Sequence, residues 1–154
     1  MFDTIRGLPV HALVLHGAVV LVPMAALLTV LVALIGRWRP RGAWPVVALN
    51  ALTLATVFVA TQSGQELQSR LPSNEQISEH AERGNAMTLF ALGLMAASVL
   101  VALVRRRSGA VVMAVGALAV VAAAAATVWV VLVGDSGSTA VWKDVISSTN
   151  RPSG

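Results

Sequence analysis

Four long apolar runs constrain the fold of this chain more than any other feature. They span residues 8–36, 44–61, 86–104 and 109–133. Each run approaches or exceeds the ~20 residues that an α-helix needs to cross the ~30 Å hydrocarbon core of a bilayer. Because lipid offers no hydrogen-bonding partners, only helices satisfy their own backbone in single segments of this length. The sequence therefore predicts an all-α fold, an integral membrane four-helix bundle.

The expected domain organisation is simple, because 154 residues leave room for one domain. We expect a four-helix transmembrane domain over residues 1–134 and an outer-facing tail over residues 135–154. The helices are expected at about 8–36, 44–64, 74–104 and 109–133. The end of the tail is rich in Ser, Thr, Pro and Gly, which indicates partial disorder.

The distribution of charge predicts the orientation of the bundle. Six of the eleven basic residues lie in two short turns, namely Arg37, Arg39, Arg41, Arg105, Arg106 and Arg107. All seven acidic residues fall in segments on the opposite side. Arginine-rich turns face the cytoplasm in membrane proteins. We therefore expect a multi-pass protein of the cell membrane with both termini on the non-cytoplasmic side, in contact with the lipid bilayer and with no nucleic-acid partner.

A weak internal repeat links the two halves of the chain. Val30–Leu34 is identical in sequence to Val99–Leu103, 69 residues later, and an arginine-rich turn follows each. Ser-Gly pairs follow the second and fourth apolar runs, at positions 63 and 136. Such matches also arise by chance in helices rich in Ala and Val, so duplication and coincidence both stay open. A genuine duplication would relate two hairpins by a pseudo-twofold axis along the membrane normal.

The repeat brings two histidines into register. His80 follows His11 by the same 69 residues, and both precede the cytoplasmic turns by about 35 Å of helix. Two imidazoles at one depth on facing helices could ligate a b-type haem near the outer interface. Arg83 could pair with a haem propionate. The alternative is that His80, between Glu79 and Glu82, is a solvated residue at a helix end.

His16 is a third candidate ligand because it lies well inside the first apolar run. An ionisable residue at such a position is a functional hypothesis by default. It follows His11 by five residues, which is ~140° around a regular helix. His16 could replace His11 as a ligand, or it could hydrogen-bond a cofactor, a quinol or a neighbouring carbonyl.

Other chemistry is weakly supported. His11, His16 and His80 could hold a transition metal such as zinc or copper, although no HxxxH or HExxH motif occurs. The absence of cysteine excludes thioether-linked haem, Cys-ligated iron–sulfur clusters and thiol catalysis. Ser63 and Ser136 lie outside any G-x-S-x-G motif, and their Ser-Gly pairs are interpreted as helix ends. We therefore assign no catalytic residues, and the sequence favours an electron-transfer or accessory membrane protein over an enzyme while leaving enzyme activity open.

Several short motifs resemble a bacterial membrane family known as domain of unknown function 2231. They are Gly7–His11, His16, Ser63–Glu66, His80, Gly134–Gly137 and Trp142. The chain departs from the family pattern at Ala12 and at Gly17-Ala18, where relatives carry prolines after the histidines. The resemblance implies a four-helix membrane module that is sometimes fused to Rieske or c-type cytochrome domains. Such fusions imply a redox setting without defining an activity.

The sequence thus leaves three functional hypotheses. The first is a haem-binding or redox-associated module with ligands from His11, His16 and His80. Its electron partner would be a quinol, an outer-face cytochrome or a larger respiratory-type membrane complex. The second is a cofactor-free accessory subunit of a larger membrane complex, and the third is an outer-facing zinc or copper site. Oligomerisation stays open under all three.

Overall fold

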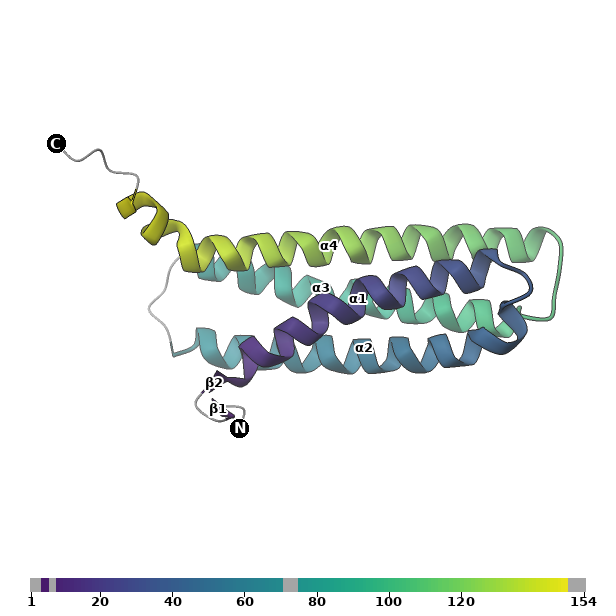
Figure 1. Cartoon of the computed structure of the whole chain (residues 1–154), viewed down its shortest axis with the longest axis horizontal. Coiled ribbons are helices and arrows are strands. Elements are labelled where there is room, and N and C mark those ends of the chain that lie inside the picture. The colour runs from purple at the N-terminus through teal and green to yellow at the C-terminus, as the bar shows by residue number, and fades with distance from the viewer. Residues whose placement is uncertain (1–3, 6–7, 71–74, 150–154) are drawn as a thin grey trace.

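Four helices account for most of the chain in the computed structural model, which describes residues 4–5, 8–70 and 75–149 (Figure 1). They are α1 (Val10–Leu34), α2 (Arg39–Gln68), α3 (Glu75–Leu103) and α4 (Ala110–Thr149). A short antiparallel pair, β1 (Thr4–Ile5) and β2 (Leu8–Pro9), precedes α1. All four helices are long and apolar enough to cross a membrane. The prediction of an all-α membrane bundle is confirmed.

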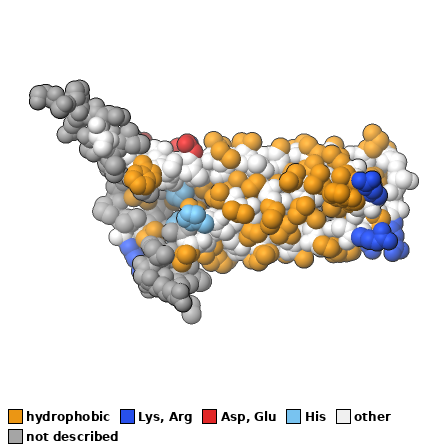
Figure 2. All heavy atoms as spheres, viewed as in Figure 1, with side chains coloured by type: hydrophobic (Ala, Val, Ile, Leu, Met, Phe, Trp, Pro, Cys, Tyr) orange, Lys and Arg blue, Asp and Glu red, His pale blue; other side chains and the backbone are white. Residues whose placement is uncertain are grey.

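The helices run alternately up and down the bundle (Figure 1). Each of α1 and α3 packs against both α2 and α4, so α1 and α3 lie diagonally across the bundle. The starts of α1 and α3 and the end of α2 lie together at one end of the bundle, beside the C-terminal half of α4 (Figure 1). This end is here called the histidine end. The two arginine-rich turns lie at the other, here called the arginine end (Figure 2). A broad belt of apolar side chains separates the two ends.

Small residues form much of the core. Ala25, Ala102, Ala119 and Ala126 have no measurable exposure, and alanine allows helix backbones to approach closely in a membrane. Larger apolar side chains instead cover the outer surface, as expected for helices that face lipid (Figure 2). Van der Waals packing of small residues therefore holds the bundle together, because lipid provides little hydrophobic driving force between helices.

The arginine end repeats one contact in both halves. Arg39 Nη2 donates a hydrogen bond to the Ala33 carbonyl at the end of α1, at 2.8 Å. Arg105 Nη1 donates to the Ala102 carbonyl at the end of α3, at 2.9 Å. Ala33 and Ala102 are equivalent in the 69-residue repeat. Each arginine side chain thus donates to a carbonyl in the last turn of a helix, where carbonyls lack regular intrahelical partners, although the Ala102 carbonyl also accepts from the Arg105 backbone N–H at 3.4 Å.

The helix boundaries differ from those expected at three places. Helix α2 begins at Arg39 rather than at 44, because Pro40 suits the first turn of a helix. It also continues past Ser63-Gly64 to Gln68. Helix α4 continues past Val133 to Thr149, so residues 135–149 of the expected tail are helical. The expected start of the third helix at 74 and the tail residues 150–154 lie outside the described residues.

Candidate functional site

His11 and His80 meet at the histidine end of the bundle. His11 belongs to the first turn of α1, and His80 lies near the start of α3. Their ring centroids are 6.2 Å apart, with an interplanar angle of 75°. Because α1 and α3 lie on a diagonal, the two imidazoles come together across the bundle centre. The structure therefore brings together the two histidines that the sequence repeat aligned.

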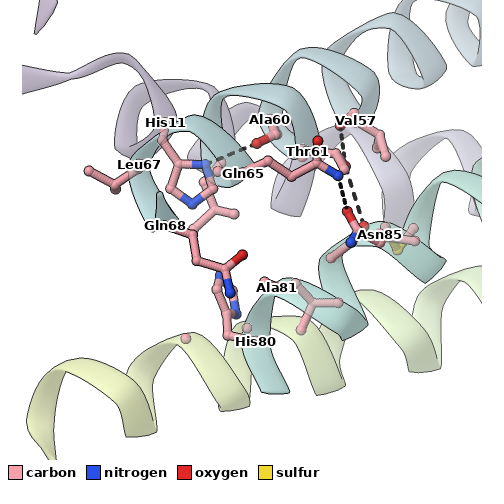
Figure 3. A pocket seen from close by; sticks show the side chains of 18 of the residues that line it. His11, Val57, Ala60, Thr61, Gln65, Leu67, Gln68, His80, Ala81 and Asn85 are labelled. Atoms are coloured by element: carbon pink, nitrogen blue, oxygen red, sulfur yellow. Dashed lines mark hydrogen bonds between the residues drawn. The ribbon is translucent and has the colours of Figure 1, made fainter. Parts of the chain in front are cut away.

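The imidazole of His11 rests on helix α2. Its Nδ1 lies 3.0 Å from the Ala60 carbonyl oxygen (Figure 3). The same nitrogen lies 3.4 Å from Ser63 Oγ. The Ser63 hydroxyl in turn donates to the Ala60 carbonyl, at 3.0 Å. A serine and the carbonyl three residues before it thus hold one nitrogen of the ring.

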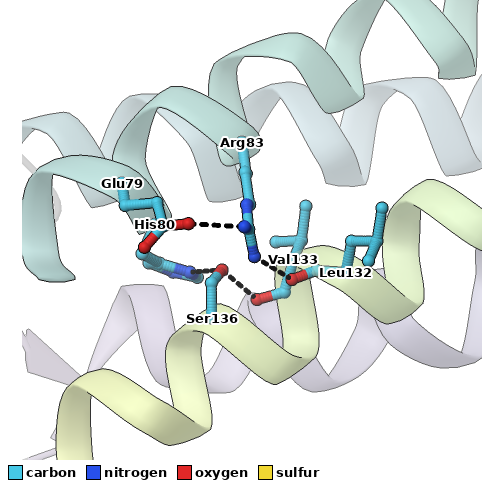
Figure 4. A network of polar contacts seen from close by, with 6 residues as sticks. All are labelled: Glu79, His80, Arg83, Leu132, Val133 and Ser136. Atoms are coloured by element: carbon cyan, nitrogen blue, oxygen red, sulfur yellow. Dashed lines mark hydrogen bonds and ion pairs between the residues drawn. The ribbon is translucent and has the colours of Figure 1, made fainter.

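The imidazole of His80 rests on helix α4 in the same way. Its Nδ1 lies 3.1 Å from Ser136 Oγ, and the Ser136 hydroxyl donates to the Val133 carbonyl at 2.9 Å (Figure 4). Ser136 and Val133 stand 73 residues after Ser63 and Ala60. The two hairpins therefore carry the same histidine–serine–carbonyl arrangement, which supports a genuine duplication.

A glycine beside each serine lets the ring approach the helix backbone. A Cβ atom added to Gly64 would lie 2.9 Å from His11 Cε1, and one added to Gly137 would lie 3.0 Å from His80 Cε1. Real Cβ atoms essentially never show a contact as short as the one at Gly64, and the contact at Gly137 is tighter than nine in ten real Cβ contacts. The interpretation of both Ser-Gly pairs as helix ends is wrong, since both lie within helices and support the imidazoles. The sequence signal was the recurrence of a Ser-Gly pair in each half of the chain, 73 residues apart.

A mostly apolar cavity of about 450 Å³ opens beside the two imidazoles (Figure 3). All four helices line it, and along α2 its wall reaches from Val57 to Gln68, about 16 Å of helix. Polar side chains in the wall besides the histidines include Thr61, Gln65, Gln68, Asn85 and Ser138. The volume lies within the range of ~300–1,000 Å³ that is typical of small-molecule sites.

Comparison with known proteins identifies the family. A family model of predicted membrane proteins, DUF2231, matches residues 7–150. The chain belongs to the DUF2231 family. The resemblance inferred from the short motifs is therefore confirmed. Neither the curated proteins nor the solved structures gave a significant match.

His16 does not join the histidine pair in this DUF2231 chain. Its side chain is exposed on α1, and it does not line the cavity. The five-residue separation from His11 turns the two side chains ~140° apart on the helix. Only His11 on α1 is therefore placed to act together with His80.

Arg83 lies on α3 one turn after His80 and is bonded to neighbouring groups of α3 and α4. Its guanidinium forms an ion pair with Glu79 in the same helix and donates a hydrogen bond to the Leu132 carbonyl of α4 at 3.4 Å (Figure 4). Arg83 does not line the cavity. Its role as a propionate partner stays a prediction, and it would require Arg83 to exchange its present partners.

The number of available ligands limits the kind of centre that this DUF2231 site can hold. Within residues 4–5, 8–70 and 75–149, no three His, Cys, Asp or Glu side chains are grouped closely enough to bind a metal ion. His11 and His80 together offer two nitrogens. Zinc sites ordinarily use three or four protein ligands, so the described site suits a centre that needs only two.

Proposed function

We propose that the protein is a haem-binding, redox-associated membrane module in which His11 and His80 hold one b-type haem at the non-cytoplasmic end. The observation that carries this proposal is the 6.2 Å separation of the two imidazole centroids. Nitrogen–metal distances are about 2 Å, so two imidazoles that share one metal ion have centroids about 6 Å apart. The separation of His11 and His80 matches that requirement.

The ligand count and the cavity both favour haem over a bare metal ion. A porphyrin supplies four nitrogens of its own, so the protein needs to provide only the two axial ligands. The cavity beside the histidines is predominantly apolar and is lined by all four helices, as expected for a macrocycle buried in a bundle. Zinc, in contrast, would lack the third protein ligand that it ordinarily has.

A single haem would make this protein an electron carrier at one membrane face. The chain contains only three histidines, so it can form at most one bis-histidine site. That site lies at the histidine end, opposite the arginine end of the bundle (Figure 2). The proposed partners are therefore a quinol or an outer-face cytochrome on the same side, as part of a larger redox assembly.

Absorption spectroscopy of the detergent-purified protein, expressed with haem supplied, tests this proposal. The wild-type protein should show a Soret band with the split visible bands of a low-spin haem. His80→Ala and His11→Ala should each lose most of this signal, because each removes one axial nitrogen. His16→Ala is the matched control, and it should keep the wild-type spectrum because His16 does not line the cavity.

A folded wild-type protein that takes up no haem would contradict the proposal. Retention of the full low-spin spectrum in His80→Ala would do the same. The protein would then fit better as a cofactor-free accessory subunit, whose paired histidines would serve only helix packing.

A further inference from the structure

We infer that the two Ser-Gly segments fix His11 and His80 as the Nδ1–H tautomer, so that both Nε2 atoms offer lone pairs to one cavity. This inference deepens the proposed function, because it concerns the same two histidines and defines the chemical class of their ligand. The tautomer excludes ligands that present only hydrogen-bond acceptors, and the 6.2 Å separation of the ring centroids favours a single metal centre that accepts both lone pairs.

The tautomer of His11 follows from its nearest partner. The Ala60 carbonyl oxygen, 3.0 Å from Nδ1, can only accept a hydrogen bond. The Ser63 hydroxyl directs its proton to the same carbonyl. Nδ1 must therefore carry the proton, and in a neutral imidazole Nε2 is then bare. In Figure 3 the other nitrogen of His11 points away from Ala60, toward the side on which His80 lies.

The tautomer of His80 follows from the hydroxyl beside it. The Ser136 hydroxyl donates its proton to the Val133 carbonyl at 2.9 Å, so its oxygen is left to accept from His80 Nδ1 at 3.1 Å. Nδ1 again carries the proton, and Nε2 is bare. Metal-binding histidines commonly use the same device, in which a hydrogen bond at one nitrogen orients the other toward the metal.

Two unprotonated Nε2 atoms, on rings whose centroids are 6.2 Å apart, exclude some classes of ligand. A quinone presents carbonyl oxygens, which cannot bond to a nitrogen that has no proton. A quinol has two hydroxyl groups on opposite sides of its ring, and bridging both nitrogens would hold them about 11 Å apart at ordinary hydrogen-bond lengths. The imidazole centroids are only 6.2 Å apart. A single atom that accepts both lone pairs fits the space between the rings.

Nitrogen NMR of the cofactor-free protein tests the inference without any bound ligand. The chain has only three histidines, so labelling with ¹⁵N-histidine gives three ring systems, which His11→Gln, His80→Gln and His16→Gln assign. At alkaline pH, where the rings are neutral, His11 and His80 should show a protonated Nδ1 and an unprotonated Nε2. In water the Nε2–H tautomer predominates, so this result requires the contacts described above.

Gly137→Ala provides the perturbation, because the added Cβ would lie 3.0 Å from His80 Cε1 and 3.3 Å from Nδ1, so the ring would have to shift at the nitrogen that contacts Ser136. His80 should then lose its Nδ1–H signal and gain the Nε2–H form, while His11 stays unchanged as an internal control for folding. Gly134→Ala is the matched control, since Gly134 also lines the cavity but an added Cβ meets nothing within 4 Å. It should leave both histidine spectra unchanged.

An Nε2–H tautomer at His11 or His80 in the wild-type protein would overturn the inference, and that measurement needs no variant. Its failure is distinct from failure of the proposed function. Nδ1–H tautomers in a protein that takes up no haem would leave the inference intact and reject haem. Haem uptake by a protein whose cofactor-free form shows Nε2–H tautomers would support the proposed function and overturn the inference.

Discussion

The position of the His11 ring depends on the absence of a Cβ atom at Gly64. The His11 ring lies so close to the α2 backbone that a Cβ at position 64 would come within 2.9 Å of Cε1 and 3.2 Å of Nδ1. Glycine is favoured where a group must approach the backbone closely. The residue therefore acts on the site through the position of His11, although it offers no ligand of its own.

We predict that Gly64→Ala lowers the affinity for haem about 10-fold to 100-fold, the usual effect of disturbing a group that orients a metal ligand. Haem titration followed by the Soret absorbance measures this affinity. Gly93→Ala serves as the control, because Gly93 is exposed on α3 outside the cavity lining and its added Cβ meets nothing within 4 Å. Equal affinities for Gly64→Ala and Gly93→Ala would show that the close contact does not matter.

At the residue scale, the sequence predicted that His11 and His80 lie together, but it did not predict the Ser-Gly segments that hold their rings. The 69-residue repeat indicated that His11 and His80 lie at one depth, and the structure places them together. The five-residue spacing from His11 already indicated that His16 points ~140° away from it, and His16 lies outside the cavity lining in the structure. The two Ser-Gly pairs are visible in the sequence, but the contacts of Ser63 and Ser136 with the imidazoles could not be inferred, because they depend on which helix each histidine faces.

At the scale of the helices, a polar contact joins α1 and α2 within the apolar core. Asn50 Nδ2 donates a hydrogen bond to Thr29 Oγ1 at 3.0 Å, and the two side chains are 2% and 1% exposed. Thr29 donates its own proton to the Ala25 carbonyl at 2.7 Å. A buried interhelical hydrogen bond of this kind stabilises a membrane protein by about 0.6 kcal/mol, and by up to about 1.7 kcal/mol.

We predict that Thr29→Val lowers the free energy of unfolding by about 1 kcal/mol, because valine keeps the shape but removes the acceptor. Reversible unfolding in mixed detergent micelles measures the change. Thr56→Val is the control, since its exposed hydroxyl bonds only to the Leu52 carbonyl of its own helix, and it should change stability by less than ~0.5 kcal/mol. Unchanged stability in Thr29→Val would argue against the Asn50 contact.

The helices themselves were predictable from the apolar runs, whereas their ends were not. Runs of about 20 apolar residues identify membrane helices without reference to packing. Glycine after serine suggests a helix end in soluble proteins, but glycine is common inside membrane helices. Helices α2 and α4 therefore continue through Ser63-Gly64 and Ser136-Gly137, where packed histidines cover the glycines.

At the scale of the whole molecule, the arginine-rich turns and the histidine site lie toward opposite ends of the bundle axis. The arginine-rich turns lie at one end, and His11 and His80 lie near the other (Figure 2). Arginine-rich turns are retained in the cytoplasm, so the paired histidines should face the non-cytoplasmic side. Under the proposed function, this orientation would determine which redox partners could reach the site.

Single-cysteine labelling tests the orientation, because the native chain contains no cysteine. Ser69→Cys lies at the end of α2, and Ser108→Cys lies in the turn between α3 and α4; both positions are exposed. A membrane-impermeant thiol reagent should label Ser69→Cys in intact cells and Ser108→Cys only after permeabilisation. The opposite pattern would place the histidine end in the cytoplasm.

The identity of the axial ligands tests the central claim most directly. Near-infrared magnetic circular dichroism of the oxidised, haem-loaded protein distinguishes bis-histidine from histidine–methionine ligation, which matters because Met87 also lines the cavity. We predict the charge-transfer band of a low-spin, bis-histidine haem. A histidine–methionine band, a high-spin spectrum or the absence of any haem signal would contradict the claim that His11 and His80 hold one metal centre between them.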